Sequence, residues 1–87
     1  MKRNINKMIG KVVRHFKGDF YLVLGVIIDS ETGRKMVHYK ALYENYLEYA
    51  RDLEMFMSEV DAEKYPNASQ KVAVVLADKN LRLRQRR

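Results

Sequence analysis

The sequence predicts a small, mainly β protein, an antiparallel β-barrel with one short helical turn. Short apolar segments alternate with short turns along the chain. None of the connections is long enough for the crossover helices that parallel strands require. With 87 residues, the chain forms a single small core. Closing the sheet would remove exposed strand edges, which favours a barrel.

The first two strands are expected at 11–16 and 20–28, joined by a turn at Lys17-Gly18-Asp19. The second is rich in β-branched and aromatic residues, and both of its faces are apolar. Such a strand lies in the middle of a sheet with both faces covered, or it bends from one sheet into another. Here the bend would fall at Gly25.

A hairpin connection at 30–34, with Gly33 in the left-handed position, leads to a strand at 35–42. Alternation along this strand predicts its core-facing set. These residues are Val37, Tyr39, Ala41 and Tyr43. A turn at 43–45 and a strand at 46–51 follow.

The stretch 52–60 has apolar residues at helical spacing, and Asp52 can cap a helix there. In a small barrel such a stretch is often one tight turn followed by a strand. Pro66 ends any helix or strand that precedes it. The Val/Ala-rich stretch 71–77 fits a closing strand or a short helix, and periodicity alone does not separate the two.

The chain divides into a basic leader at 1–9, a barrel at 10–70 and a C-terminal extension at 71–87 with a basic tail. Of the net charge of +6, the excess lies at the two ends, whereas 19–70 holds five basic and ten acidic residues. The tail is either solubilising or an arm for nucleic acid. Its basic residues are Lys79, Arg82, Arg84, Arg86 and Arg87.

Composition removes several classes of protein. The absence of cysteine excludes a disulfide framework and fits a reducing cytoplasm. No apolar run approaches the roughly 18 residues of a membrane span. The basic start at 1–3 lacks the apolar region of a secretory signal. We therefore expect a cytoplasmic protein without membrane association.

Catalysis has little support in the sequence. The two histidines and three serines form no recognisable arrangement of nucleophile, base and orienting acid. Neither histidine has the spacing of a metal ligand. We expect no enzyme activity, no metal and no cofactor.

Two features suggest binding. Arg14 and His15 are adjacent and could bind an anion or carboxylate. Alternatively, Arg14 pairs with an acid such as Glu54 and His15 hydrogen-bonds a turn. The second feature is the set of tyrosines, whose rings with polar tips suit recognition of peptides or bases. We expect Tyr21 and Tyr39 inside and Tyr43, Tyr46 and Tyr49 at least partly exposed.

Three stretches carry a family resemblance. They are Arg14-His15-Phe16-Lys17-Gly18, Tyr39-Lys40-Ala41-Leu42-Tyr43 and Arg51-Asp52-Leu53-Glu54-Met55-Phe56. In this order and spacing they resemble the bacterial family catalogued as domain of unknown function 1653, over roughly residues 10–70. The resemblance implies a small SH3-like barrel and supplies no function. The chain departs from the family's pattern at Val13 and Tyr49, where an aromatic and a tryptophan are usual, and at Asp52, where proline is usual.

Together these observations predict a non-catalytic interaction module that binds an unidentified protein or peptide through an aromatic-basic rim. The candidate binding residues are Arg14, His15, Tyr43, Tyr46, Tyr49 and Arg51. The alternative is an RNA- or DNA-binding accessory domain that uses the basic termini.

Overall fold

The fold is taken from a computed structural model that describes residues 4–77. The fold consists mainly of one β-sheet, together with a short 3-10 helix and a single turn of α-helix. In chain order the elements are η1 (Ile5–Lys7), β1 (Val12–His15), β2 (Phe20–Ile28), β3 (Lys35–Ala41), β4 (Glu48–Asp52), α1 (Leu53–Phe56) and β5 (Val74–Leu76).

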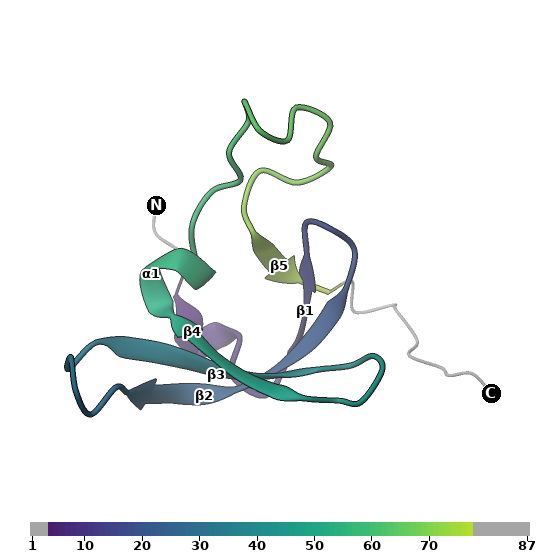
Figure 1. The fold of residues 1–87 in the computed structure, drawn as a ribbon. Coiled ribbons are helices and arrows are strands. Elements are labelled where there is room, and N and C mark those ends of the chain that lie inside the picture. Colours follow the sequence, from purple (N-terminus) through teal and green to yellow (C-terminus); the bar gives the residue numbers. More distant parts are fainter. Residues whose placement is uncertain (1–3, 78–87) are drawn as a thin grey trace.

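The strands form one antiparallel sheet in the order β4-β3-β2-β1-β5. This confirms the predicted mainly β, antiparallel fold with one short helical turn. The sheet is bent (Figure 1), but it is not closed into a barrel. Within residues 4–77, β4 pairs only with β3 and β5 only with β1. β5 has three residues and does not pair with β4. The chain that connects the two strands, α1 and residues 57–73, lies on one side of the sheet (Figure 1).

The predicted strands lie where the sequence indicates, and β2 has the predicted bounds. Gly18 and Gly33 adopt φ of 112° and 75° in the two predicted turns, a region that glycine enters without steric cost. The strand expected at 46–51 begins later, at Glu48. Glu44 and Tyr46 have left-handed φ of 52° and 56°, so the turn extends beyond its predicted end.

A β-bulge interrupts β2, the strand whose two faces are both apolar. The pairing with β3 shifts between Val23 and Gly25, which leaves Leu24 as the extra residue and increases the local bend. Because β2 lies in the middle of a single sheet, its predicted central position is confirmed, and the predicted alternative of a bend from one sheet into another is wrong. The outer face stays uncovered within the described residues, since Ile27, which alternates with the inward-facing Val26, is 44% exposed.

The core is small and lies on the concave face of the bent sheet. Its buried side chains are Met8, Val13, Val23, Val37, Ala41, Phe56 and Val74. Tyr21 and Tyr39 pack against this cluster while remaining only partly buried. The predicted inward face of β3 is confirmed, because Val37 and Ala41 are buried and Tyr39 contacts the core.

The helical spacing after Asp52 produces one turn, α1. The Asp52 carboxylate accepts hydrogen bonds from the backbone N–H groups of Glu54 and Met55, at 2.9 and 3.3 Å, so it is the predicted cap. The buried Phe56 fixes the turn to the core. The chain then leaves the sheet and returns to it in an excursion, residues 57–73, that we call the arm.

The base of the arm is closed by an isolated bridge between Glu59 and Val72. The Val60 N–H donates to the Lys71 carbonyl at 2.7 Å, and the Ala73 N–H donates to the Ser58 carbonyl at 2.8 Å. After the arm, β5 pairs with β1. The stretch 71–77 therefore supplies a strand and no helix.

One side chain, Gln70, fastens the arm to β1. Its amide nitrogen donates to the carbonyls of Arg14, Val72 and Ala73 at 3.3, 2.9 and 3.2 Å. Its amide oxygen accepts from the Arg14 guanidinium at 3.1 Å. The expected pairing of Arg14 with Glu54 is thus wrong. Arg14 alternates with Val13 and His15, which face the core and the cavity. Its side chain therefore points away from the cavity, and its guanidinium donates to Gln70.

Replacing Gln70 with alanine should loosen the arm selectively. The substitution removes the bonds of Gln70 to the Val72 carbonyl and to the Arg14 guanidinium, which costs about 1–3 kcal/mol. Hydrogen exchange measured by NMR should then show faster exchange for the Val60 and Ala73 amides, with the Val23 amide unchanged. Asn67→Ala, an exposed position of the same arm, is the matched control. Equal exchange rates in the two variants would show that Gln70 does not hold the arm.

Candidate functional site

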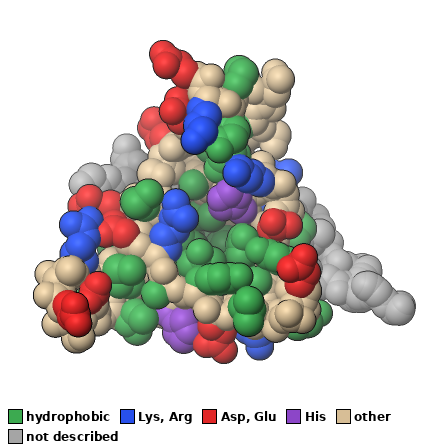
Figure 2. Space-filling model, in the orientation of Figure 1, with side chains coloured by type: hydrophobic (Ala, Val, Ile, Leu, Met, Phe, Trp, Pro, Cys, Tyr) green, Lys and Arg blue, Asp and Glu red, His purple; other side chains and the backbone are tan. Residues whose placement is uncertain are grey.

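A cavity of about 470 Å³ lies on the concave face, between the sheet, α1 and the arm. Figure 2 shows hydrophobic side chains in the hollowed centre of this face, with Lys and Arg side chains around it. The sheet contributes His15, Tyr21, Tyr39, Arg51 and Val74, the turn after β1 contributes Phe16 and Lys17, and the opposite wall includes Met55, Phe56, Ser58, Glu59, Asp61, Lys64 and Tyr65.

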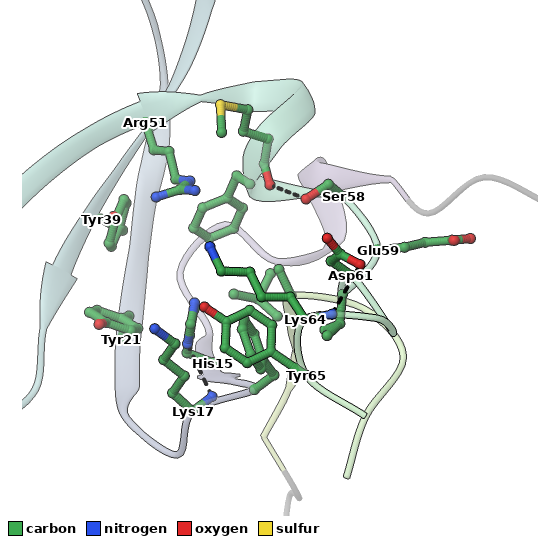
Figure 3. Close-up of a pocket in the computed structure, with 16 residues that line it drawn as sticks. His15, Lys17, Tyr21, Tyr39, Arg51, Ser58, Glu59, Asp61, Lys64 and Tyr65 are labelled. Carbon is green, nitrogen blue, oxygen red and sulfur yellow. Dashed lines mark hydrogen bonds between the residues drawn. The ribbon is translucent and has the colours of Figure 1, made fainter. Parts of the chain in front are cut away.

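His15 enters the cavity from the end of β1. Its Nδ1 accepts a hydrogen bond from the Lys17 backbone N–H at 3.1 Å, which confirms the predicted contact with a turn. Burial, and then the nearby charges of Lys17 and Arg51, lower the pKa of His15 below its ordinary 6.5. The ring is therefore neutral near pH 7, and because Nδ1 is an acceptor, Nε2 carries the hydrogen. His15 presents a donor to the cavity (Figure 3).

Lys17 lies beside two rings at the mouth of the cavity. Its Nζ is 5.2 Å from the centre of the Tyr65 ring and 5.9 Å from that of Phe16. The two rings meet edge to face, with centroids 4.9 Å apart. Cation–π attraction therefore orients the Lys17 ammonium while leaving its hydrogens available to a ligand.

Arg51 reaches the cavity from β4. Burial raises the pKa of Tyr39, and the adjacent Arg51 guanidinium partly offsets that rise, so the two side chains interact. In the part of the chain that the structure describes, the side-chain ion pairs are Arg34 with Asp52 and His38 with Glu48. Arg51 thus has no carboxylate partner among residues 4–77.

The carboxylates near the cavity are occupied or turned away. Asp61 accepts from the backbone N–H groups of Glu63 and Lys64, at 3.0 and 3.3 Å, and so caps a turn of the arm. The Glu59 side chain points away from the cavity (Figure 3). His15, Lys17 and Arg51 direct donors inward, and we call these three the donor cluster. Lys64 adds a further positive charge to the cavity lining, with its Nζ 5.7 Å from the centre of the Tyr65 ring.

Aromatic rings form a continuous surface beside the donor cluster. Tyr21 packs edge-on against Tyr39 and Tyr43, with centroids 5.2 and 5.7 Å apart. Tyr39 in turn contacts Tyr49 at 5.7 Å and Phe56 at 5.2 Å. The hydroxyls of Tyr21 and Tyr43 lie 3.1 Å apart and share a hydrogen bond. Burial and this bond raise the pKa of Tyr21, so it stays protonated at neutral pH.

The structure brings together only some of the predicted site residues. His15 and Arg51 line the cavity, and Tyr43 and Tyr49 adjoin its ring surface. Tyr46, 56% exposed, lies in the turn before β4. Arg14 faces the other side of β1. The tail residues proposed for nucleic acid, Lys79, Arg82, Arg84, Arg86 and Arg87, lie outside the described residues.

Most cavity residues were not predicted as site residues from the sequence, and Phe16, Lys17 and Tyr65 are the most informative of them. Phe16 and Lys17 directly follow the Arg14-His15 pair, so their place in the same hairpin was a usable signal. Tyr65 reaches the cavity only through the packing of the arm, which no local pattern announces. Within residues 4–77 there is no group of three or more His, Cys, Asp or Glu side chains that could hold a metal ion. The same range contains no helix long and apolar enough to cross a bilayer.

Comparison with known proteins gives a family and no activity. The sequence model described as "Protein of unknown function (DUF1653)" matches residues 11–82. A crystal structure of a DUF1653 protein from Bordetella bronchiseptica is similar in sequence and fold. It is 33% identical, with a TM-score of 0.58, and the match covers 67% of this chain and 77% of that one. No curated protein matches the chain. The chain belongs to the DUF1653 family of proteins of unknown function.

Proposed function

We propose that this protein is a non-catalytic binding module that holds an acidic segment of a protein or peptide in its concave cavity. The observation that carries the proposal is the donor cluster. His15, Lys17 and Arg51 come from two strands and a turn, yet they line one cavity. A set of donors without a carboxylate partner favours a ligand that brings its own negative charge.

The rings support a peptide as the body of that ligand. Half-buried tyrosines offer apolar faces together with polar tips, a combination enriched where proteins bind one another. Tyr21, Tyr39 and Tyr65 border the cavity next to the donor cluster. A carboxylate bound there would leave the neighbouring part of the peptide in contact with ring faces. The lack of cysteine agrees with a cytoplasmic location for such a module.

Charge distribution favours a single acidic group over a polyanion. Residues 4–77 hold ten Lys and Arg and ten Asp and Glu, so the described part of the chain is neutral overall. Proteins that track a nucleic acid backbone neutralise many phosphates along an extended basic surface. The donor cluster is local. Binding of RNA or DNA through the basic tail stays a prediction.

Arg51→Gln should weaken binding of acidic peptides by about tenfold or more, since a charge-assisted hydrogen bond contributes roughly 1.5–3 kcal/mol. The measurement is fluorescence anisotropy with a pool of labelled random peptides, each containing one glutamate, and with a glutamine-containing pool of the same composition. Lys35→Gln removes an exposed positive charge at the start of β3, away from the cavity, and it should bind like the wild type. Equal binding of both pools, or tighter binding of a single-stranded oligonucleotide, would contradict the proposal.

Peptide binding should strengthen as the pH falls. An anion in the cavity favours the protonated form of His15, so the pKa of His15 is higher in the complex than in the free protein, where it is lowered. Binding then takes up a proton, and affinity rises as pH falls through the interval between the two values. Titration calorimetry in two buffers of different ionisation enthalpy measures this uptake. The His15→Gln variant should bind the peptide with no proton uptake. Proton uptake equal to that of the wild type would show that another group takes up the proton.

A further inference from the structure

We propose that the ligand is an extended acidic segment of another protein that pairs, as an added strand, with the free edge of β4. This inference rests on the proposed function and adds to it the conformation of the ligand. β4 is the longer edge strand in the described part of the chain, with five residues against three in β5. Residues 48–51 are all exposed, and among residues 4–77 β4 pairs only with β3.

Among residues 4–77, the backbone of β4 has hydrogen-bonding groups at two positions that the sheet does not use. The Ala41 N–H donates to the Leu47 carbonyl at 2.9 Å. In an antiparallel pair, hydrogen-bonded positions recur at every second residue. Tyr49 and Arg51 therefore turn their backbone groups toward β3, opposite Tyr39 and Val37. The N–H and C=O groups of Glu48 and Ala50 point outward, where a further strand would meet them.

The same strand carries two side chains of the candidate site. Tyr49 and Arg51 pair with inward-facing residues of β3, so they lie on the concave face, and Arg51 lines the cavity. A strand added to β4 would lie about 4.7–4.9 Å away. Every second side chain of that strand would point to the concave face. An acidic side chain there would be next to the Arg51 guanidinium, and backbone pairing would supply the remaining affinity.

The acidic side chains of β4 do not oppose this ligand. Glu48 and Asp52 alternate with Tyr49 and Arg51, so they lie on the convex face. Each already has a partner there. Glu48 contacts His38 Nε2 at 2.8 Å, and Asp52 pairs with Arg34. The charge that an approaching segment meets on the concave side of this edge therefore comes from the donor cluster, which selects an acidic segment.

The sharpest test uses the peptide backbone. The probe is a labelled octapeptide of alternating threonine and valine with one central glutamate, and two further versions carry a single N-methyl group on adjacent residues. Consecutive N–H groups of a strand point in opposite directions, so only one of them faces β4. One methylated version should bind about tenfold more weakly than the parent or worse, and the other should match the parent. Equal affinities for the two methylated versions would overturn edge pairing.

A protein variant tests the other side of the pairing. Ala50→Pro removes an outward N–H, a change that edge strands tolerate. The variant should bind the parent octapeptide about tenfold more weakly than the wild type does, or weaker still. Circular dichroism checks that the variant is folded. If it is not, the pair of methylated peptides with the wild-type protein decides the matter alone. Sedimentation should show a monomer for the wild type; a dimer that Ala50→Pro dissociates would assign the edge to a second copy of this chain and overturn the proposal.

The two proposals fail in different ways. Arg51→Gln weakens an acidic ligand whether or not the edge is used. If it does so while both methylated peptides bind like the parent, the cavity keeps its proposed function and edge pairing is wrong. If the octapeptide and the glutamate-containing pool both fail to bind the wild type, the proposed function is wrong as well, and the inference about β4 falls with it.

Discussion

The hydrogen bonds of Gln70 join the arm to β1, and the cavity depends on that junction. A single bent sheet of five strands has a concave face that needs a covering layer, and α1 alone is one turn long. The arm supplies the missing wall and brings Tyr65 over Phe16. Gln70 bonds to carbonyls in both β1 and the arm, and the Phe16 N–H donates to the Ala73 carbonyl at 2.8 Å, so together these bonds hold the arm beside β1. The site is therefore a consequence of how this small core is covered.

The composition of the core explains why tyrosines surround the site. The largest fully buried side chains are valines, Val13, Val23 and Val37, which leave a thin central layer. Larger rings around such a layer are covered on one side only, and a tyrosine hydroxyl needs a polar partner or water. The bond between Tyr21 and Tyr43 meets this need inside the molecule. The remaining ring surface faces the cavity, so the features that complete the fold also provide a surface for a ligand.

Local patterns predicted the strands well because alternation and turn residues are local properties. The bounds of β2, the cap at Asp52 and the turn at Gly33 follow from their own neighbours in sequence. The predicted pairing of Arg14 with Glu54 was wrong because the partner of Arg14 depends on where the arm returns to β1, which long-range packing decides. The position of Tyr65 in the cavity was not predicted for the same reason. The tyrosine-rich turn was expected to form the site together with Arg51, yet the left-handed φ of Tyr46 keeps that residue in the turn before β4.

Failure of the sheet to close links the fold to the proposed function. In a closed barrel, β4 and β5 would satisfy each other's outer backbone groups, and the concave face would be filled by side chains. Here β4 remains an edge, and the concave face holds the cavity. Edge strands are usually protected by charge or by a covering segment, but the charges of β4 are engaged on the convex face by Arg34 and His38. Arg51 is common to the open edge and the cavity, so a ligand that satisfies the edge also reaches the donor cluster.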